Sequence, residues 1–390
     1  MIERDLAPRI LRAAASFPAV TLTGPRQSGK STLCRALFPE HPYANLESPD
    51  VREFAASDPR GFLSQFPRGA ILDEVQRAPE LASYLQPLID EDPAPGRWIL
   101  TGSQNFALLE SVSQSLAGRS AVLHLLTLTR GEIARFPGPP RTLDELLFTG
   151  GYPRIYDRQI PASDWLSAYA ATYIERDVRT ISNVGDLTAF RRFVELCAGR
   201  TAQLLNYSQL AADSGVSQPT AKAWVSILEA SFIIFLLPAW SGNLRKRLVK
   251  MPKLHFYDTG LVCHLLGIRT AQELRTHPLR GPVFETWVAS EAAKHRLNAG
   301  ERGGMHHYRD RAGVEADLLV DRSGGGVRVV EAKAGATIAK DMLAPALRVA
   351  GLLGGGEGER PLVVYGGDER QERSGCVVSG WARLSPEDVR

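Results

Sequence analysis

The chain has 390 residues, of which 44% are hydrophobic and 23% charged, and its net charge of +3 and this composition exclude wholesale disorder. It is too long for one typical core, and we expect three domains, over residues 1–150, 151–270 and 271–390. The four cysteines lie far apart, which argues against a zinc site or a disulfide framework and favours a reducing, cytoplasmic location.

A phosphate-binding loop is predicted near the N-terminus. The apolar run AVTLTG leads into GPRQSGKST and then into the helical pattern STLCRALF, which is the order of strand, glycine loop and helix that such a loop needs. Backbone N–H groups and the positive end of the helix favour phosphate oxygens. Lys30 is expected to contact the β- and γ-phosphates, and Ser31 to hold Mg²⁺. The expected ATP-binding residues of the loop are Gly24, Pro25, Arg26, Gln27, Ser28, Gly29, Lys30, Ser31 and Thr32.

Two carboxylates end the apolar run GAILDE, as expected where a buried parallel strand delivers acidic side chains to its C-terminal edge. Asp73 is expected to hold the Mg²⁺ directly or through water. Glu74 is expected to polarise the attacking water and so to act as the catalytic base. Either residue alone can be a solvent-facing strand end, but both beside an intact phosphate loop favour hydrolysis and not only binding.

Two more polar side chains are expected at the edge of a parallel sheet. Its strands are predicted near residues 19–23, 43–47, 69–73, 97–101 and 121–127. Ser103, at the end of WILTGSQ, is expected to sense the γ-phosphate. Arg119 precedes the last strand, a location from which an arginine can stabilise transition-state charge in a neighbouring subunit of a homo-oligomer. The alternative for Arg119 is an ordinary surface arginine.

The middle of the chain is predicted to contain a winged helix. NYSQLAADSGVSQPTAKAWVSILEA gives a helix, a turn at Ser214 and Gly215, and a second helix capped by Ser217, which is the helix-turn-helix layout. The runs FIIFLLPAW and KLHFYD are expected to be strands that flank the basic turn SGNLRKRLVK. The apolar run ASFIIFLLPAW has about half the length of a bilayer span, so membrane insertion is not expected.

This middle segment is the expected DNA-binding region. Residues 173–253 contain eleven Lys and Arg against six Asp and Glu, and the resulting charge of +5 can attract phosphate backbones. Contact with DNA that does not depend on the base sequence is favoured. The alternative is that the winged helix is a lid that transmits the nucleotide state without touching DNA. The candidate DNA contacts are Gln218, Thr220, Lys222, Arg245, Lys246, Arg247 and Lys250. In YIERDV, Arg176 either acts between subunits or pairs with Glu175 and Asp177.

The C-terminal elements complete a resemblance to a known family. They are predicted as a helix at 283–298, strands at 305–309, 314–321 and 327–333, a helix at 338–352 and a strand at 361–366. This αβββαβ order resembles the core of restriction-endonuclease-like folds. With the stretches GPRQSGKST, LDEVQRAPEL, LTGSQ, GGYP, YIERDV, KLHFYDTGL and FETWVASE, the chain resembles the prokaryotic family that joins an AAA-type P-loop ATPase to such a domain. The resemblance implies an α/β protein with a parallel ATPase sheet and a helical, winged-helix middle.

A hairpin in the C-terminal region carries a candidate nuclease site. Symmetric closure around Gly324 pairs residues whose numbers sum to 648, which places Asp317 opposite Glu331 with Lys333 on the same face. Two opposed carboxylates repel each other unless something such as Mg²⁺, which prefers oxygen ligands, offsets their charge. Lys333 is then expected to orient the nucleophile or to neutralise developing charge. The resemblance adds Glu285, in VFETW, as a third ligand.

Two alternatives to a metal site remain open. The same register offers Lys333 an ordinary cross-strand ion pair with Glu315. A β-bulge or an uneven loop would separate Asp317 from Glu331 by one face of the sheet.

The leading functional expectation is an ATP-hydrolysing DNA-processing protein that couples nucleotide state to DNA binding and carries a Mg²⁺-dependent, nuclease-like C-terminal site. The alternative is an ATP-dependent regulatory or defence switch whose C-terminal domain binds a partner without cutting. A third expectation is a protein remodeller with no role in nucleic-acid chemistry.

Overall fold

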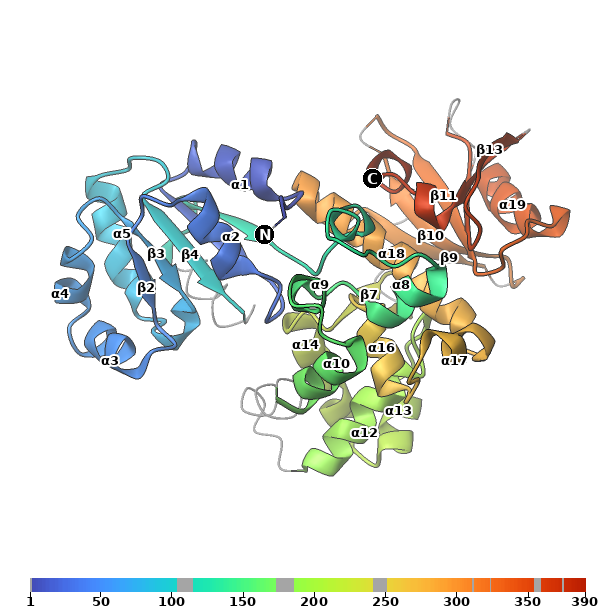
Figure 1. The fold of residues 1–390 in the computed structure, drawn as a ribbon, viewed down its shortest axis with the longest axis horizontal. Helices are drawn as coiled ribbons and strands as arrows, with labels where there is room; N and C mark the ends of the chain where they lie inside the picture. The colour runs from blue at the N-terminus through green and yellow to red at the C-terminus, as the bar shows by residue number, and fades with distance from the viewer. Residues whose placement is uncertain are drawn as a thin grey trace. The chain divides into compact units, whose positions relative to one another are not determined.

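The computed structural model describes residues 2–103, 115–172, 186–240, 251–310, 312–322, 324–353, 359–373 and 375–390 (Figure 1). The chain divides into two compact units. The first comprises Met1–Leu128, Ala230–Phe232 and Leu297–Gly300, and the second comprises Thr129–Glu229, Ile233–Arg296 and Glu301–Arg390. None of the helices in the described ranges is long and apolar enough to cross a membrane.

A parallel five-stranded sheet with the order β2-β3-β4-β1-β5 forms the centre of the first unit. Its strands are β1 (Ala19–Thr23), β2 (Tyr43–Asn45), β3 (Ala70–Asp73), β4 (Trp98–Gly102) and β5 (Ser120–His124). All five predicted strands are confirmed, with differences only at their ends. The three central strands are buried along their whole length, as expected for a parallel sheet covered on both faces.

Helices cover both faces of this sheet. They are α1 (Ala7–Ala14), α2 (Lys30–Leu37), α3 (Pro49–Ser57), α4 (Pro59–Ser64) and α5 (Leu81–Glu91), with the 3-10 turn η1 (Val75–Arg77) after β3. On one face Leu22 packs in a cluster with Ile10 of α1 and Leu33 of α2. On the other face Leu72 packs with Leu85 of α5. Because the strands are parallel, their C-terminal ends meet at one edge, which is where such sheets place their sites.

The second unit begins with helices and a small antiparallel sheet with the order β6-β8-β7. These elements are α7 (Arg130–Ile133), α8 (Leu143–Thr149), α9 (Pro153–Asp157), α10 (Ala162–Tyr169), α12 (Leu187–Ala198), β6 (Gln203–Leu204), α13 (Tyr207–Ser214), α14 (Gln218–Ala230), β7 (Ile234–Leu237), β8 (Lys253–Phe256), α16 (Thr259–Leu265) and α17 (Ala271–Thr276). The predicted helix-turn-helix is confirmed: Gly215 has a φ of 76°, and the Ser217 hydroxyl accepts the Thr220 N–H at 3.2 Å. The basic turn at 241–250 lies outside the described residues.

Two family-like stretches, GGYP and KLHFYDTGL, pack against each other within this unit. The Asp258 carboxylate accepts the backbone N–H of Gly151 at 2.7 Å and that of Leu261 at 2.9 Å, so it joins the turn to the start of α16. Gly150 has a φ of 72°, and a Cβ there would collide with the same carboxylate. These stretches therefore have a structural role here.

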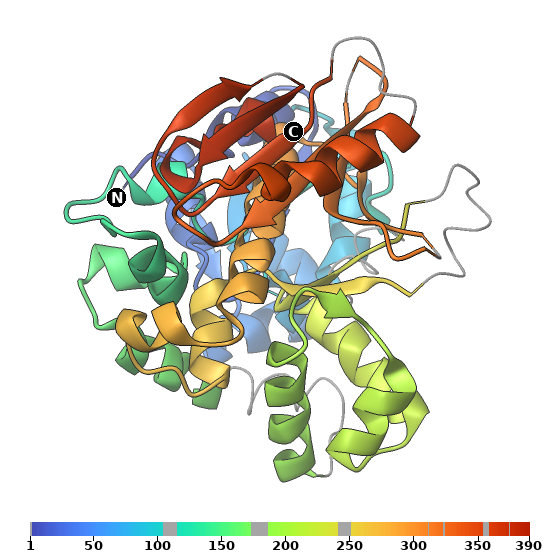
Figure 2. The same ribbon diagram turned by 90° about the vertical axis from the view of Figure 1, so that its right-hand side faces the viewer.

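A six-stranded mixed sheet with the order β13-β14-β12-β11-β10-β9 completes the second unit, and Figure 2 shows it from a second side. In chain order, the helices and strands of this region are α18 (Arg280–Ala299), β9 (Met305–Arg309), β10 (Glu315–Asp321), β11 (Val327–Lys333), η3 (Lys340–Leu343), α19 (Ala344–Leu352), β12 (Leu362–Tyr365), β13 (Arg370–Arg373) and β14 (Cys376–Gly380). The predicted αβββαβ elements are confirmed, although the second helix begins at Ala344, after a 3-10 turn. Strands β13 and β14 were not predicted. Val349 of α19 packs on the sheet beside Leu319 and Val363.

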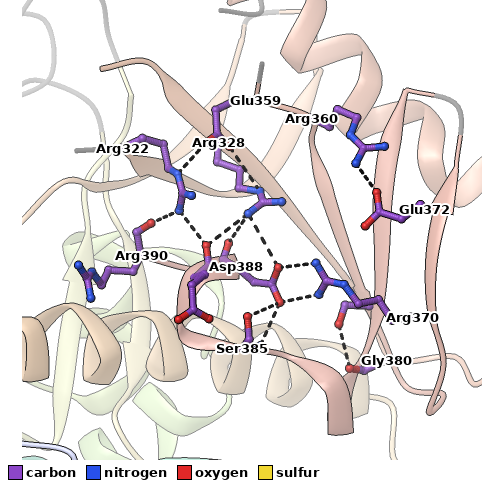
Figure 3. A network of polar contacts seen from close by, with 12 residues as sticks. Arg322, Arg328, Glu359, Arg360, Arg370, Glu372, Gly380, Ser385, Asp388 and Arg390 are labelled. Atoms are coloured by element: carbon purple, nitrogen blue, oxygen red, sulfur yellow. Dashed lines mark hydrogen bonds and ion pairs between the residues drawn. The ribbon is translucent and has the colours of Figure 1, made fainter. Parts of the chain in front are cut away.

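Two short turns, η4 (Trp381–Arg383) and η5 (Pro386–Asp388), end the chain, and the polar network in Figure 3 ties η5 to this sheet. Arg370 of β13 donates two hydrogen bonds to the Asp388 carboxylate, at 2.7 and 3.0 Å. Ser385 donates a third, at 3.0 Å. Burial alone would raise the pKa of Asp388, but the bonds from Arg370 and Ser385 outweigh it and lower that pKa. The network therefore has a structural role, because it holds the C-terminal turn η5 against β13.

Candidate functional site

The predicted phosphate loop joins β1 to α2 and depends on two glycines. Gly24 has a φ of 146° and Gly29 a φ of 92°. A Cβ on Gly24 would collide with the backbone carbonyl oxygen of Leu125, so only glycine fits there. Gln27, at the exposed tip of the loop, also has a positive φ of 63°. The loop thus has the tight wrap that the sequence predicted.

Lys30 lies inside this loop with only 5% of its surface exposed. Its Nζ donates to the carbonyl oxygens of Gly24 at 3.0 Å and Pro25 at 2.8 Å. Burial lowers the pKa of Lys30 to about 8. Ser28 Oγ is buried and has no hydrogen-bond partner among the described residues, so it is a donor that a phosphate oxygen would satisfy. Arg26 is half-buried in the same loop, and Thr32 is exposed on the first turn of α2.

The predicted Mg²⁺ pair, Ser31 and Asp73, lies together. Ser31 Oγ donates to Asp73 Oδ1 at 2.9 Å. Asp73 is 4% exposed and also accepts hydrogen bonds from Thr101 and, at 2.5 Å, from Tyr43. Burial and the bond to Asp73 raise the pKa of Tyr43. Two adjacent oxygen donors beside a phosphate loop suit a divalent cation. The sequence analysis missed Tyr43 and Thr101, because nothing local links them to Asp73.

Glu74 follows Asp73 with a φ of 58°, in the left-handed region that non-glycine residues rarely adopt. Its Oε2 accepts a hydrogen bond from Ser103 Oγ at 3.0 Å and another from the Gln76 amide. Glu74 and Ser103, predicted separately, are therefore brought together. Gln76 was missed, because its contact with Glu74 depends on the unusual backbone conformation of Glu74.

Arg119 precedes β5 as predicted, but its guanidinium is paired within the same chain. It donates to both carboxylate oxygens of Asp90, at 2.6 and 2.9 Å. A role for Arg119 in a neighbouring subunit, and the homo-oligomer that it requires, remain predictions. Arg176 lies outside the described residues.

The hairpin β10–β11 closes in the predicted register, because the pairs Leu318 with Val330 and Leu319 with Val329 both sum to 648. An irregularity in the pairing with β9 lies between Ala316 and Leu319. Asp317, which lies inside it, accepts the backbone N–H of Ala332 through Oδ2 at 2.9 Å. The bulge considered as an alternative is not seen in the hairpin itself, which keeps one register from Leu318 to Asp321, and Asp317 faces its predicted partner strand.

Asp317, Glu331 and Glu285 form one cluster with two lysines, which we call the acidic cluster. Lys333 Nζ donates to Glu331 Oε1 at 2.6 Å, whereas Glu315 pairs with Arg309 at 3.0 Å and so does not hold Lys333. Burial first, and then the charge of Asp317, raise the pKa values of Glu285 and Glu331, while the neighbouring lysines oppose this rise. The structure therefore brings together the residues that the sequence analysis selected.

Lys253 of β8 is the member of the acidic cluster that the sequence analysis missed. Its Nζ lies 2.6 Å from Glu285 Oε1 and 3.6 Å from Asp317 Oδ1, and its side chain is 8% exposed. The neighbouring carboxylates outweigh burial and raise the pKa of Lys253. Two residues after Lys253, the buried His255 also contacts α18, because its Nδ1 lies 3.1 Å from the hydroxyl oxygen of Thr286. Lys253 thus links the small sheet to the C-terminal sheet within the second unit.

The acidic cluster does not fit Mg²⁺ in this arrangement. Lys253 lies where a cation shared by Glu285 and Asp317 would lie, and Lys333 occupies one oxygen of Glu331. Glu331 Oε2 is buried without a hydrogen-bond partner in the described parts of the chain. Within those parts, no three His, Cys, Asp or Glu side chains form a group that could hold a metal ion. The charge of the cluster is instead offset by two ammonium groups.

Only part of the predicted DNA-binding set can be located. Gln218 and Lys222 are exposed on α14, and the Lys222 ammonium lies 5.7 Å from the centre of the Tyr207 ring. Thr220 is half-buried on the first turn of that helix. Arg245, Lys246, Arg247 and Lys250 lie outside the described residues. DNA contact by this segment remains a prediction.

Solved structures with a similar arrangement have low similarity scores. A Walker-type ATPase of Pyrococcus abyssi is 16% identical, with a TM-score of 0.37 over 68% of this chain and 96% of its own. RuvB of Thermotoga maritima is 18% identical, with a TM-score of 0.34 over 64% of this chain and 95% of its own.

Family models match three consecutive stretches. An AAA domain matches residues 16–134, and two domains of unknown function, DUF8612 and DUF4143, match residues 140–272 and 280–384. The resemblance of the last stretch to restriction endonucleases remains a prediction. Uncharacterized proteins of Mycobacterium tuberculosis and Mycobacterium bovis are 31% identical over 324 residues, which is 82% of this chain and 71% of theirs. The chain therefore belongs to the same family as these mycobacterial proteins, and its first unit carries an AAA-type P-loop ATPase domain.

Proposed function

We propose that the first unit hydrolyses ATP and that its nucleotide state controls DNA binding by the second unit. One observation carries the proposal: Lys30, the Ser31–Asp73 pair and Glu74 all lie where strands β1 and β3 end at one edge of the parallel sheet. A phosphate-binding cation, oxygen donors for a divalent cation and a carboxylate base are the parts that phosphoryl transfer to water needs.

The residues of the site divide this work. Lys30 exchanges its carbonyl partners for phosphate oxygens, and the loop N–H groups and Ser28 Oγ donate to the same phosphates. Ser31 and Asp73 would hold Mg²⁺, which supplies neutralising charge beside the β- and γ-phosphates. The Glu74 carboxylate orients the attacking water and accepts its proton. Ser103 holds Glu74 in place until the γ-phosphate arrives.

Glu74→Gln is expected to keep ATP binding and to lose hydrolysis. The amide keeps the size of the side chain but accepts no proton, and general-base catalysis contributes roughly 10²- to 10⁴-fold to rate. We expect turnover to fall at least about tenfold while the dissociation constant of a fluorescent ATP analogue changes little. Glu80→Gln, an exposed acid of the same unit, is the matched control. Full turnover by Glu74→Gln would remove this residue from its role.

The coupling to DNA is tested by measuring wild-type turnover with linear, single-stranded and branched DNA. The exposed Gln218 and Lys222 on the second helix of the helix-turn-helix support a DNA-facing surface. Stimulation by one of these DNA structures is the expected result, with Lys30→Ala as the control for a contaminating ATPase. An unchanged rate with all three would count against DNA processing.

A second candidate function, a switch whose C-terminal sheet binds a partner without cutting, is favoured by the position of Lys253. With this lysine between Glu285 and Asp317, we expect no DNA cleavage with Mg²⁺ or Mn²⁺ that depends on Asp317. The measurement compares wild type with Asp317→Ala, Lys333→Ala and Lys30→Ala on labelled duplexes. Cleavage that is lost in the first two variants but kept in Lys30→Ala would establish a separate nuclease centre instead.

A further inference from the structure

We infer that Gln76 is a positioning residue for ATP hydrolysis, which holds the Glu74 carboxylate in place for its work as a base. The inference rests on the proposed ATPase function. Gln76 belongs to η1, the single 3-10 turn that follows Glu74. Because Glu74 has a φ of 58°, the chain turns back at this point and brings the Gln76 side chain to the carboxylate of Glu74.

Three side chains form a closed ring at the ends of β3 and β4. Gln76 Nε2 donates to Glu74 Oε2 and lies 3.3 Å from Ser103 Oγ, and Ser103 Oγ donates to the same Glu74 oxygen at 3.0 Å. Ser103 is fully buried and Gln76 is 9% exposed, so solvent competes little for these bonds. One oxygen of the Glu74 carboxylate is therefore held by two donors.

The orientation of the Gln76 amide follows from chemistry. An ionised carboxylate only accepts hydrogen bonds, so the amide nitrogen must face Glu74 and the amide oxygen must point elsewhere. Gln76 Oε1 is buried without a hydrogen-bond partner among the described residues. Leaving a buried acceptor without a partner is costly, so the amide is held in this orientation by the bonds of its nitrogen to Glu74 and Ser103. The Gln76 amide is therefore fixed in one orientation, with its nitrogen on the Glu74 carboxylate.

A purely structural role for Gln76 is the competing explanation, since the ring also joins two neighbouring strands. The two roles differ in what they change. A structural bridge affects folding and ATP affinity together with the rate. A positioning residue changes kcat and leaves KM and nucleotide affinity alone, and its effect disappears when Glu74 has already been removed.

The test measures ATP turnover by Gln76→Leu, which has similar size but no hydrogen bonds, and by Gln76→Asn, which keeps the amide but shortens its reach. We expect kcat to fall at least about fivefold in each, with KM and the affinity for a fluorescent ATP analogue within about twofold. In the Glu74→Gln background, single-turnover measurements should show no additional loss from Gln76→Leu. Gln65→Leu, at an exposed glutamine of the same unit, is the matched control.

The outcomes separate this inference from the proposed function. Wild-type turnover that is lost in Glu74→Gln but unchanged in both Gln76 variants would overturn the inference alone. Losses that multiply in the double variant, or a rise in KM that matches the fall in kcat, would show a structural bridge instead. A wild-type protein without ATP turnover would overturn both.

Discussion

Replacing Gly24 by alanine is expected to abolish ATP binding and to destabilise the first unit by about 2 to 5 kcal/mol. A left-handed φ costs an L-residue about 1–2 kcal/mol, and overpacking a closed site costs about 1–3 kcal/mol more. The new Cβ would collide with the carbonyl oxygen of Leu125, which belongs to the backbone and not to a flexible side chain. The Leu125 N–H also donates to the Thr23 carbonyl at 2.8 Å, so neither segment can move away while keeping this bond.

Gly118→Ala is the matched control for this prediction. Gly118 lies in the same unit and has a φ of 75°, but a Cβ there would meet nothing within 4 Å. Gly118→Ala should therefore lose only the stability that the unfavourable backbone conformation costs, about 1–2 kcal/mol. Denaturant unfolding and titration with a fluorescent ATP analogue measure the two effects. Equal losses in the two variants, or normal ATP binding by Gly24→Ala, would contradict the collision.

The sequence predicted which residues of the candidate ATP site lie together, because the parts of this site are local. The strand, glycine loop and helix are consecutive, and Asp73 and Glu74 directly end a buried strand. Parallel pairing then brings those ends together without further information. The contacts of Gln76 were not predictable in this way, because they depend on the backbone conformation of Glu74 and on the end of the neighbouring strand.

In the C-terminal region, too, local features were predictable from the sequence, whereas contacts between distant segments were not. The symmetric loop between β10 and β11 was enough to predict their register. Strand β13 was missed because it consists of the four polar residues RQER, which show no apolar alternation, and the apolar strand β14, CVVSG, was missed with it. Lys253 lies 64 positions before Asp317 in the chain, and only the packing of the small sheet brings its ammonium into the acidic cluster. Local patterns carry no such information.

The largest stability effect in the second unit is expected from Lys253→Met, which should destabilise it by about 3 to 5 kcal/mol, as breaking a buried ion pair does. Methionine keeps the unbranched shape and most of the length of the side chain but removes the ammonium group and its charge. Glu285 and Asp317 would then face each other without the ammonium that lies 2.6 and 3.6 Å from them. Lys222→Met, at an exposed lysine of the same unit, should cost less than about 1 kcal/mol.

A double variant and the addition of Mg²⁺ test whether Lys253 balances the charge of the acidic cluster. Adding Glu285→Gln to Lys253→Met removes one of the repelling charges and should restore most of the lost stability, measured by denaturant unfolding. If Lys253 takes the place of a metal ion, Mg²⁺ should stabilise Lys253→Met and leave the wild type unchanged. Stabilisation of the wild type by Mg²⁺ would instead show that the cluster rearranges around a cation despite its lysine. An unaltered stability of Lys253→Met would mean that the three carboxylates do not depend on the ammonium for their charge balance.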